Sequence, residues 1–135
     1  MNPAFKTDKL YTYNDYLTWD DEKRREIIEG IVYDMSPAHS RLHQLILKKL
    51  FRQIENYLKD KACETYIAPL DVRFPALNEK DRDILNLVQP DNIIVCDKEK
   101  LDDKGCRGDP DVIIEITAPA NVSKDIKEKF ILYEK

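Results

Sequence analysis

The chain has 135 residues and a mass of 15.9 kDa, a size typical of one folded domain with a single core. Its 22 Lys and Arg nearly balance 26 Asp and Glu, and 42% of its residues are hydrophobic, which argues against disorder. No apolar stretch approaches the roughly 20 residues of a membrane span, and residues 1–10 lack the apolar core of a secretory signal. We therefore expect a cytoplasmic protein with no membrane partner. The net charge of -4 argues against nucleic-acid binding through overall charge alone.

The three cysteines are too few and too widely spaced for a disulfide framework. Cys63, Cys96 and Cys106 are therefore predicted to be reduced thiols. A structural zinc site is also disfavoured, because the chain has no Cys-x-x-Cys pair and the two histidines, His39 and His43, lie about twenty residues from the nearest cysteine.

The first half of the chain predicts a short helix, a hairpin and a long helix. Tyr13 to Trp19 forms the first helix candidate. Two β-prone runs flank Glu29-Gly30, which predicts a hairpin. From Ser40 onward, apolar residues recur at steps of three and four, which predicts an amphipathic helix with this apolar face: Leu47, Leu50, Phe51, Ile54 and Leu58.

The second half predicts three strands and a closing helix. The strands are expected at residues 65–74, 87–96 and 111–117, with a loop over 97–109 that holds one short helical turn near 98–101. Ser123 is a suitable N-cap for a helix that runs from residue 124 to the end. Without internal repeats, the order of elements predicts a single α/β domain over residues 1–135.

Two carboxylates interrupt apolar strands. Asp91 directly follows Pro90 at the start of a strand, and Glu115 lies within the apolar run 112–116. A buried carboxylate is costly unless a cation or strong donor meets it, and a magnesium or manganese ion bound by both would support phosphodiester hydrolysis. The structural alternative is that Asp91 only starts a strand while Glu115 is solvated or paired with a Lys, and spacing alone favours this alternative.

Several segments together resemble one protein family, the Uma-type restriction endonucleases of the PD-(D/E)XK nuclease superfamily. The resemblance runs from about Tyr11 to the last residue and rests on these segments: Arg25 to Gly30, Ser36-Pro37-Ala38, His43, Gln89-Pro90-Asp91, Asp111 to Pro119, and Asp125, Lys129 and Tyr133 at steps of four. It implies a restriction endonuclease-like core with a central mixed β-sheet flanked by α-helices. It also implies a DNA endonuclease that uses Mg²⁺ or Mn²⁺.

The resemblance assigns roles to three residues. Asp91 and Glu115 match the metal-binding carboxylates of the superfamily. The Lys that usually follows two residues after the Glu is replaced by Thr117, and the Uma-type pattern places it instead at Lys129 on the next helix. Helical periodicity does not distinguish Lys129 from Lys127, and the structural alternative for either is a solvated side chain, with Asp125 as the surface partner of Lys129.

Three auxiliary positions also follow from the pattern. Glu26 matches an acidic residue that can join the metal shell directly or through water. His43 shares a helix face with Leu47, so a partly buried structural histidine is as well supported as a role in the site. Asp71 lies on the polar side of its strand, where its alternative is a solvated edge charge.

Residues 41–61 carry six Lys or Arg against two acidic residues, a net charge of +4. Arg41, Lys48, Lys49 and Arg52 are candidate contacts to a DNA backbone. The alternative is the ordinary solvated face of an amphipathic helix.

A rival function is a catalytically inactive nuclease-fold module that serves interaction or regulation. The acidic net charge favours it, as does the end of the chain at Lys135, before further strands that the family resemblance predicts. An unpaired sheet edge would favour a homo-oligomer, in particular a dimer.

Overall fold

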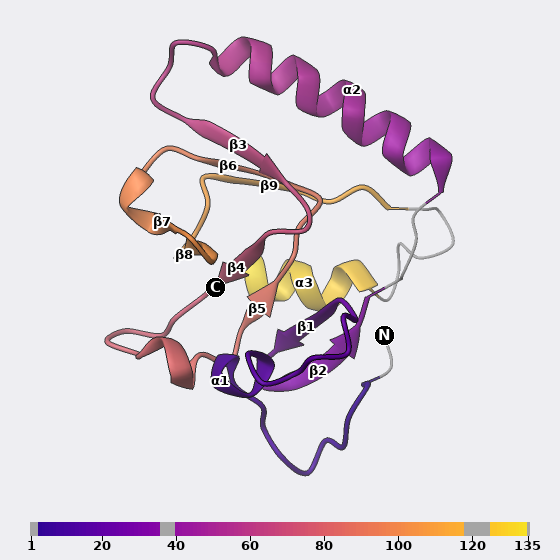
Figure 1. Ribbon diagram of the computed structural model, residues 1–135, viewed down its shortest axis with the longest axis vertical. Coiled ribbons are helices and arrows are strands. Elements are labelled where there is room, and N and C mark those ends of the chain that lie inside the picture. The colour runs from indigo at the N-terminus through magenta and orange to yellow at the C-terminus, as the bar shows by residue number, and fades with distance from the viewer. Residues whose placement is uncertain (1–2, 36–39, 118–124, 135) are drawn as a thin grey trace. The chain divides into compact units, whose positions relative to one another are not determined.

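The computed structural model describes residues 3–35, 40–117 and 125–134 (Figure 1). The chain divides into two compact units, each described by itself: the first unit comprises residues 1–37, 74–88 and 117–135, and the second unit comprises residues 38–73 and 89–116. The expected N-cap Ser123 and the segments 36–38 and 118–119 lie outside the described residues.

The first unit is built on the predicted hairpin. Strands β1 (Arg25–Ile28) and β2 (Ile31–Asp34) pair antiparallel around Glu29-Gly30, and β1 also pairs antiparallel with β5 (Leu87–Val88). Gly30 has a φ of 79°, a conformation that glycine adopts without strain. The unit also contains the 3₁₀ helix η1 (Asp81–Asp83) and α3 (Asp125–Tyr133). The hairpin and the closing helix are thus confirmed.

The N-terminal helix is shorter than the sequence predicts. Helix α1 covers only Tyr13–Tyr16, and it begins with a capping box in which Thr12 and Asp15 each bond the other's backbone N–H. The chain then leaves the helix, and Trp19 joins a cluster of aromatic rings that covers a core made of these buried residues: Tyr13, Ile27, Val32, Ile84 and Leu87.

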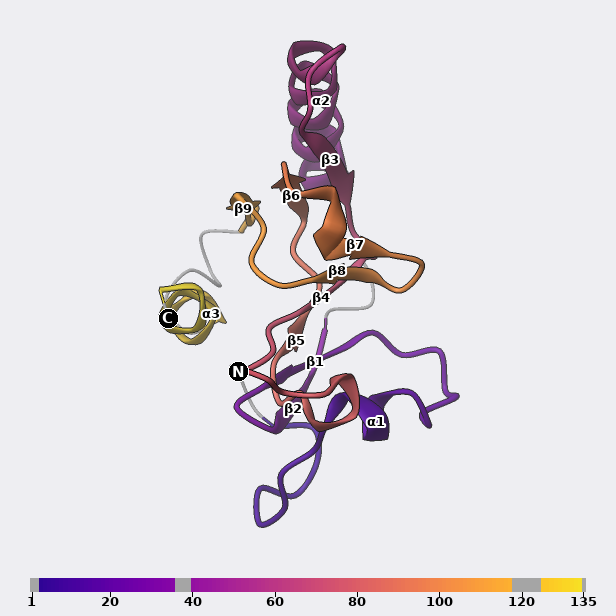
Figure 2. The same cartoon turned by 90° about the vertical axis from the view of Figure 1, so that its left-hand side faces the viewer.

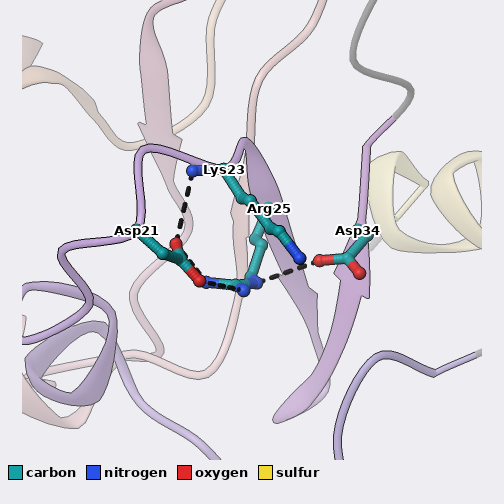
Figure 3. Close-up of polar contacts among 4 residues, drawn as sticks. All are labelled: Asp21, Lys23, Arg25 and Asp34. Carbon is teal, nitrogen blue, oxygen red and sulfur yellow. Dashed lines mark hydrogen bonds and ion pairs between the residues drawn. The ribbon is translucent and has the colours of Figure 1, made fainter.

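Arg25, at the start of β1, lies between the carboxylates of Asp21 and Asp34 (Figure 3). The residue is 5% exposed, and its guanidinium donates to Asp21 Oδ1 at 2.9 Å and to Asp34 Oδ1 at 2.9 Å. The guanidinium also lies 5.0 Å from the Phe5 ring and 5.3 Å from the Trp19 ring of the aromatic cluster. The hydrogen bond from Arg25 holds the pKa of the Asp21 carboxyl below its ordinary value. The carboxylates and the faces of the aromatic rings together stabilise the buried positive charge of Arg25.

The second unit contains one long helix, a three-stranded sheet and three further strands that belong to the six-stranded sheet of the chain. Helix α2 (Arg41–Leu58) lies alongside β3 (Glu64–Ile67), as Figure 1 and Figure 2 show. Strands β3, β6 and β9 form an antiparallel sheet, while β4 pairs parallel with β8 and β8 pairs antiparallel with β7. These strands and the 3₁₀ helix η2 have the following bounds: β4 (Asp71–Arg73), β6 (Asn92–Val95), η2 (Lys98–Lys100), β7 (Leu101–Asp102), β8 (Gly105–Arg107) and β9 (Val112–Ile114). The long helix is confirmed, and Ser40 is its N-cap.

The structure departs from the strands predicted for residues 65–109 in two ways. The segments 65–74 and 87–96 are each divided into two short strands, β3 and β4 at Pro69, and β5 and β6 at Pro90, because proline has no N–H for a strand ladder. The expected loop over 97–109 contains the predicted helical turn at 98–100, but also the hairpin of β7 and β8.

The prediction of three reduced thiols is wrong for two of them. Cys63 and Cys96 form a disulfide, because the pairing of Glu64 with Val95 in the β3–β6 ladder brings the preceding and following residues face to face. Cys106 is free and fully buried, and burial raises the pKa of its thiol to about 11.

Candidate functional site

Strand pairing in the second unit brings the two predicted metal ligands together. Asn92 pairs with Ile114 in the β6–β9 ladder, so Asp91 lies opposite Glu115. The backbone N–H of Asp91 donates to Glu115 Oε1 at 2.9 Å, and the N–H of Ile116 donates to Asp91 Oδ2 at 2.7 Å. Asp91 is 8% exposed and Glu115 is half-buried. The two carboxylates are therefore held by reciprocal bonds to the neighbouring strand.

Helix α2 carries His43 to the same carboxylate. Its Nε2 lies 3.2 Å from Asp91 Oδ1, and the two side chains are 10% and 12% exposed. The Ser40 side chain accepts from the His43 N–H at 3.0 Å, which fixes the start of the helix three residues earlier. The histidine is thus both partly buried and adjacent to Asp91.

Asp71 is paired with Gln89, a residue that was not among the candidate site residues. The side-chain amide of Gln89 donates to Asp71 Oδ1 at 2.8 Å, and Gln89 is only 6% exposed. Gln89 lies two residues before Asp91 in the Gln-Pro-Asp segment, so its position in that motif is the signal that could have identified it.

A buried polar network fixes β6 directly after Asp91. Asn92 is fully buried, and its side-chain amide donates to Thr65 Oγ1 at 2.7 Å and to the Tyr66 carbonyl at 2.8 Å. Thr65 Oγ1 in turn donates to the Ile93 carbonyl at 2.8 Å. These bonds join β6 to β3 through side chains as well as backbone, which restricts the position of Asp91. An Asn at the head of an apolar strand was the available sequence signal.

Glu26 and Lys129 form an ion pair in the first unit. Lys129 Nζ on α3 lies 2.8 Å from Glu26 Oε2 on β1, and the two side chains are 12% and 3% exposed. Two candidate residues more than a hundred positions apart in the sequence are therefore direct partners. The side chains of Lys127 and Asp125 lie outside the described residues.

The side chains at Asp91 supply only part of the ligands that a hard divalent cation needs. Asp91 and Glu115 offer carboxylate oxygens, and Mg²⁺ in proteins is commonly held by one or two carboxylates with waters completing its shell. Within residues 3–35, 40–117 and 125–134, no group of three or more His, Cys, Asp or Glu side chains is arranged to hold a metal ion. A cation at this site would therefore depend on water or substrate oxygens for most of its ligands.

The candidate DNA contacts Arg41, Lys48, Lys49 and Arg52 are all exposed on α2. None of the helices in the described part of the chain is long and apolar enough to cross a membrane.

Comparisons with known proteins identify relatives of this chain. Residues 13–135 match the model of the Uma2 family, described as "Putative restriction endonuclease". Among solved structures, the fold resembles a "putative nuclease belonging to DUF820" from Anabaena variabilis, with a TM-score of 0.66 and 18% sequence identity. The match covers 90% of this chain and 66% of that one. The mixed α/β fold expected from the sequence is thereby confirmed. A comparison with curated proteins finds no match.

Proposed function

Since the chain belongs to the Uma2 family, we propose that it is a metal-dependent DNA endonuclease that hydrolyses phosphodiester bonds at Asp91 and Glu115. One observation supports this proposal most strongly. Glu115 accepts a hydrogen bond from the Asp91 N–H, and Asp91 accepts one from the Ile116 N–H, so strand pairing holds both carboxylates in place. Burying carboxylates among apolar neighbours costs free energy, and a carboxylate that is only a surface charge would avoid this cost by staying in water.

Asp91 and Glu115 would hold the cation, Mg²⁺ or Mn²⁺. When bound, such an ion polarises a phosphate oxygen and makes a bound water more acidic. The Ile116 N–H fixes Asp91 through Oδ2, and His43 faces the other oxygen, Oδ1, at 3.2 Å. His43 is thus placed to orient Asp91 or to accept a proton near it.

Lys129 is proposed to orient the attacking water, or to deprotonate it after its ammonium group has given up its own proton. Its ammonium group is held by Glu26 at 2.8 Å, so the long side chain is already ordered and largely desolvated. Glu26 acts in this proposal through Lys129, or as a further metal ligand through water.

The test compares wild type with Asp91→Asn and Glu115→Gln. Asn at position 91 can still accept from the Ile116 N–H, so the substitution removes charge with little change of shape. Asp103→Asn is the matched control, since Asp103 is an exposed carboxylate of the same unit. We expect wild type and the control to nick plasmid DNA with Mg²⁺ or Mn²⁺, and both site variants to lose about a hundredfold or more of the rate.

Calorimetric titration with Mn²⁺ should show binding to wild type and the control, and weakened binding to the site variants. If folded wild type neither binds Mn²⁺ nor cuts DNA, or if the site variants cut as fast as wild type, the nuclease assignment is lost and the inactive interaction module becomes the better description.

A further inference from the structure

Helix α2 carries a straight line of basic side chains. At about 100° per residue, Arg41, Lys48 and Arg52 fall within about 40° of one another, and Lys59, which caps the helix, continues the same line. All four side chains are exposed. Arg41–Leu58 has 18 residues, so this basic ridge, defined as Arg41, Lys48, Arg52 and Lys59, extends over about 27 Å.

The basic ridge lies on the side of α2 away from the candidate site. His43 points to Asp91, and it lies about 160° around the helix from Arg41. The half-buried apolar residues Leu47 and Ile54 share the side of His43. Lys49 lies about 60° from Arg52 and is off the ridge. A ligand on the ridge is therefore not the same contact as a phosphodiester held at Asp91 and Glu115.

The charge of the ridge points to a polyanion. Glu55 is the one acidic residue of α2 and lies on the flank of the ridge, so the local charge stays strongly positive on a chain whose net charge is -4. The exposed ring of the helix, Tyr57, lies on another side, where the Lys61 ammonium group covers it at 4.2 Å. With no aromatic ring on the ridge, the stacking that single strands use is missing, and a continuous row of phosphates is the better partner.

We propose that the basic ridge is a second contact surface for double-stranded DNA, which it holds through the phosphate backbone on the face of α2 away from Asp91. The ridge of about 27 Å matches about eight base pairs of duplex. Its binding is independent of base sequence and adds DNA affinity that the carboxylate site does not supply. The proposal rests on the proposed function only in taking nucleic acid as the partner.

The experiment measures binding of the full chain to a fluorescently labelled duplex, by anisotropy, in EDTA, so that no cleavage is needed. The ridge variant is R41Q/K48Q/R52Q/K59Q. The control variant, K6Q/K23Q/K80Q/R82Q, removes the same four charges from exposed positions outside α2. We expect the ridge variant to bind about a hundredfold more weakly than wild type at low salt and its salt slope to fall by about 3 to 4, while the control changes affinity by less than about threefold.

A third variant tests the sign of the charge effect. Glu55→Gln removes the acidic side chain of α2, which lies beside the ridge, and should raise both the affinity and the salt slope. If the ridge variant fails to fold by circular dichroism, the half variants R41Q/K48Q and R52Q/K59Q take its place, and each should show about half of the loss of slope.

Two results would overturn the proposal: a folded ridge variant, or both half variants, binding duplex as tightly as the control, or a ridge that is needed for vesicles of anionic lipid but not for duplex. A wild type that binds duplex through the ridge yet never cuts would leave this proposal standing while the proposed nuclease function fails.

Discussion

Replacing Lys129 by Met should destabilise the first unit, because it removes the cation that lies 2.8 Å from the largely buried Glu26 carboxylate. The two charged atoms are 2.8 Å apart and both side chains are largely shielded from water. At an effective dielectric constant near 20, their attraction is about 6 kcal/mol, against which the cost of desolvating both groups must be set. Removing one partner of such a buried pair typically costs about 3 to 5 kcal/mol, and we expect Lys129→Met to fall in this range.

The double variant Glu26→Gln with Lys129→Met should be less damaging than the sum of its single changes. Once the Glu26 carboxylate is replaced, loss of the Lys129 ammonium group no longer removes an attraction between the two, so we expect a coupling energy of about 2 kcal/mol or more. If Glu26 and Lys129 interacted only weakly, the losses in free energy of unfolding of the two single variants would instead add up to that of the double variant.

Trp19 supplies the assay for this prediction. It is the single tryptophan of the chain and lies in the first unit, with its ring 5.0 Å from that of Phe5, so its fluorescence reports unfolding of the unit that holds the ion pair. Urea titrations of wild type, both single variants and the double variant give the free energies of unfolding. A loss below about 1 kcal/mol for Lys129→Met, or strict additivity, would refute the view that the pair is buried and coupled.

Two further predictions concern the second unit. Denatured without reductant, the protein should show one reactive thiol, that of Cys106, and it should show three after the disulfide of Cys63 and Cys96 is reduced. In the native state, alkylation of Cys106 should be slow up to a pH near 11. A fast reaction at pH 8 would contradict the burial of this thiol. Burial raises the pKa of Asp102, but the hydrogen bond from the fully buried Arg73 and further donors outweigh it, so the folded pKa lies below the ordinary value. This contribution to stability is present above the unfolded pKa, about 3.9, and lost as pH falls through the folded pKa. Acid unfolding curves should therefore show wild type losing its advantage over Asp102→Asn as the pH drops below about 4, and a constant difference would refute this assignment.

Local sequence signals predicted most of the regular elements. The hairpin at Glu29-Gly30, the helix after Ser40 and a strand within residues 111–117 all follow from turn chemistry or periodicity, which act within a few residues. The two divided strands show the limit of this reasoning. The alternation of apolar and polar side chains continues past Pro69 and Pro90, but the hydrogen bonds between strands are interrupted there because proline has no N–H.

Contacts between distant segments could not be predicted in the same way. The disulfide of Cys63 with Cys96 requires the register of β3 against β6, and the pairing of Glu26 with Lys129 requires the placement of α3 against β1. The resemblance to the family predicted Asp91 and Glu115 as functional residues, but not the hydrogen bonds that join them to the neighbouring backbone. The hairpin of β7 and β8 was missed because its strands have two and three residues, too few for a period to appear.

The joining of Asp91 to Glu115 also has a thermodynamic consequence. The two residues are 24 positions apart and become neighbours only when β6 pairs with β9, so the unfolded chain offers no comparable pair of oxygens. Any ligand that takes both carboxylates is therefore linked to folding of the second unit, and stabilises it by an amount that grows with the logarithm of the ligand concentration. A change that disturbs the pairing of β6 with β9 should therefore weaken ligand binding and lower the free energy of unfolding together.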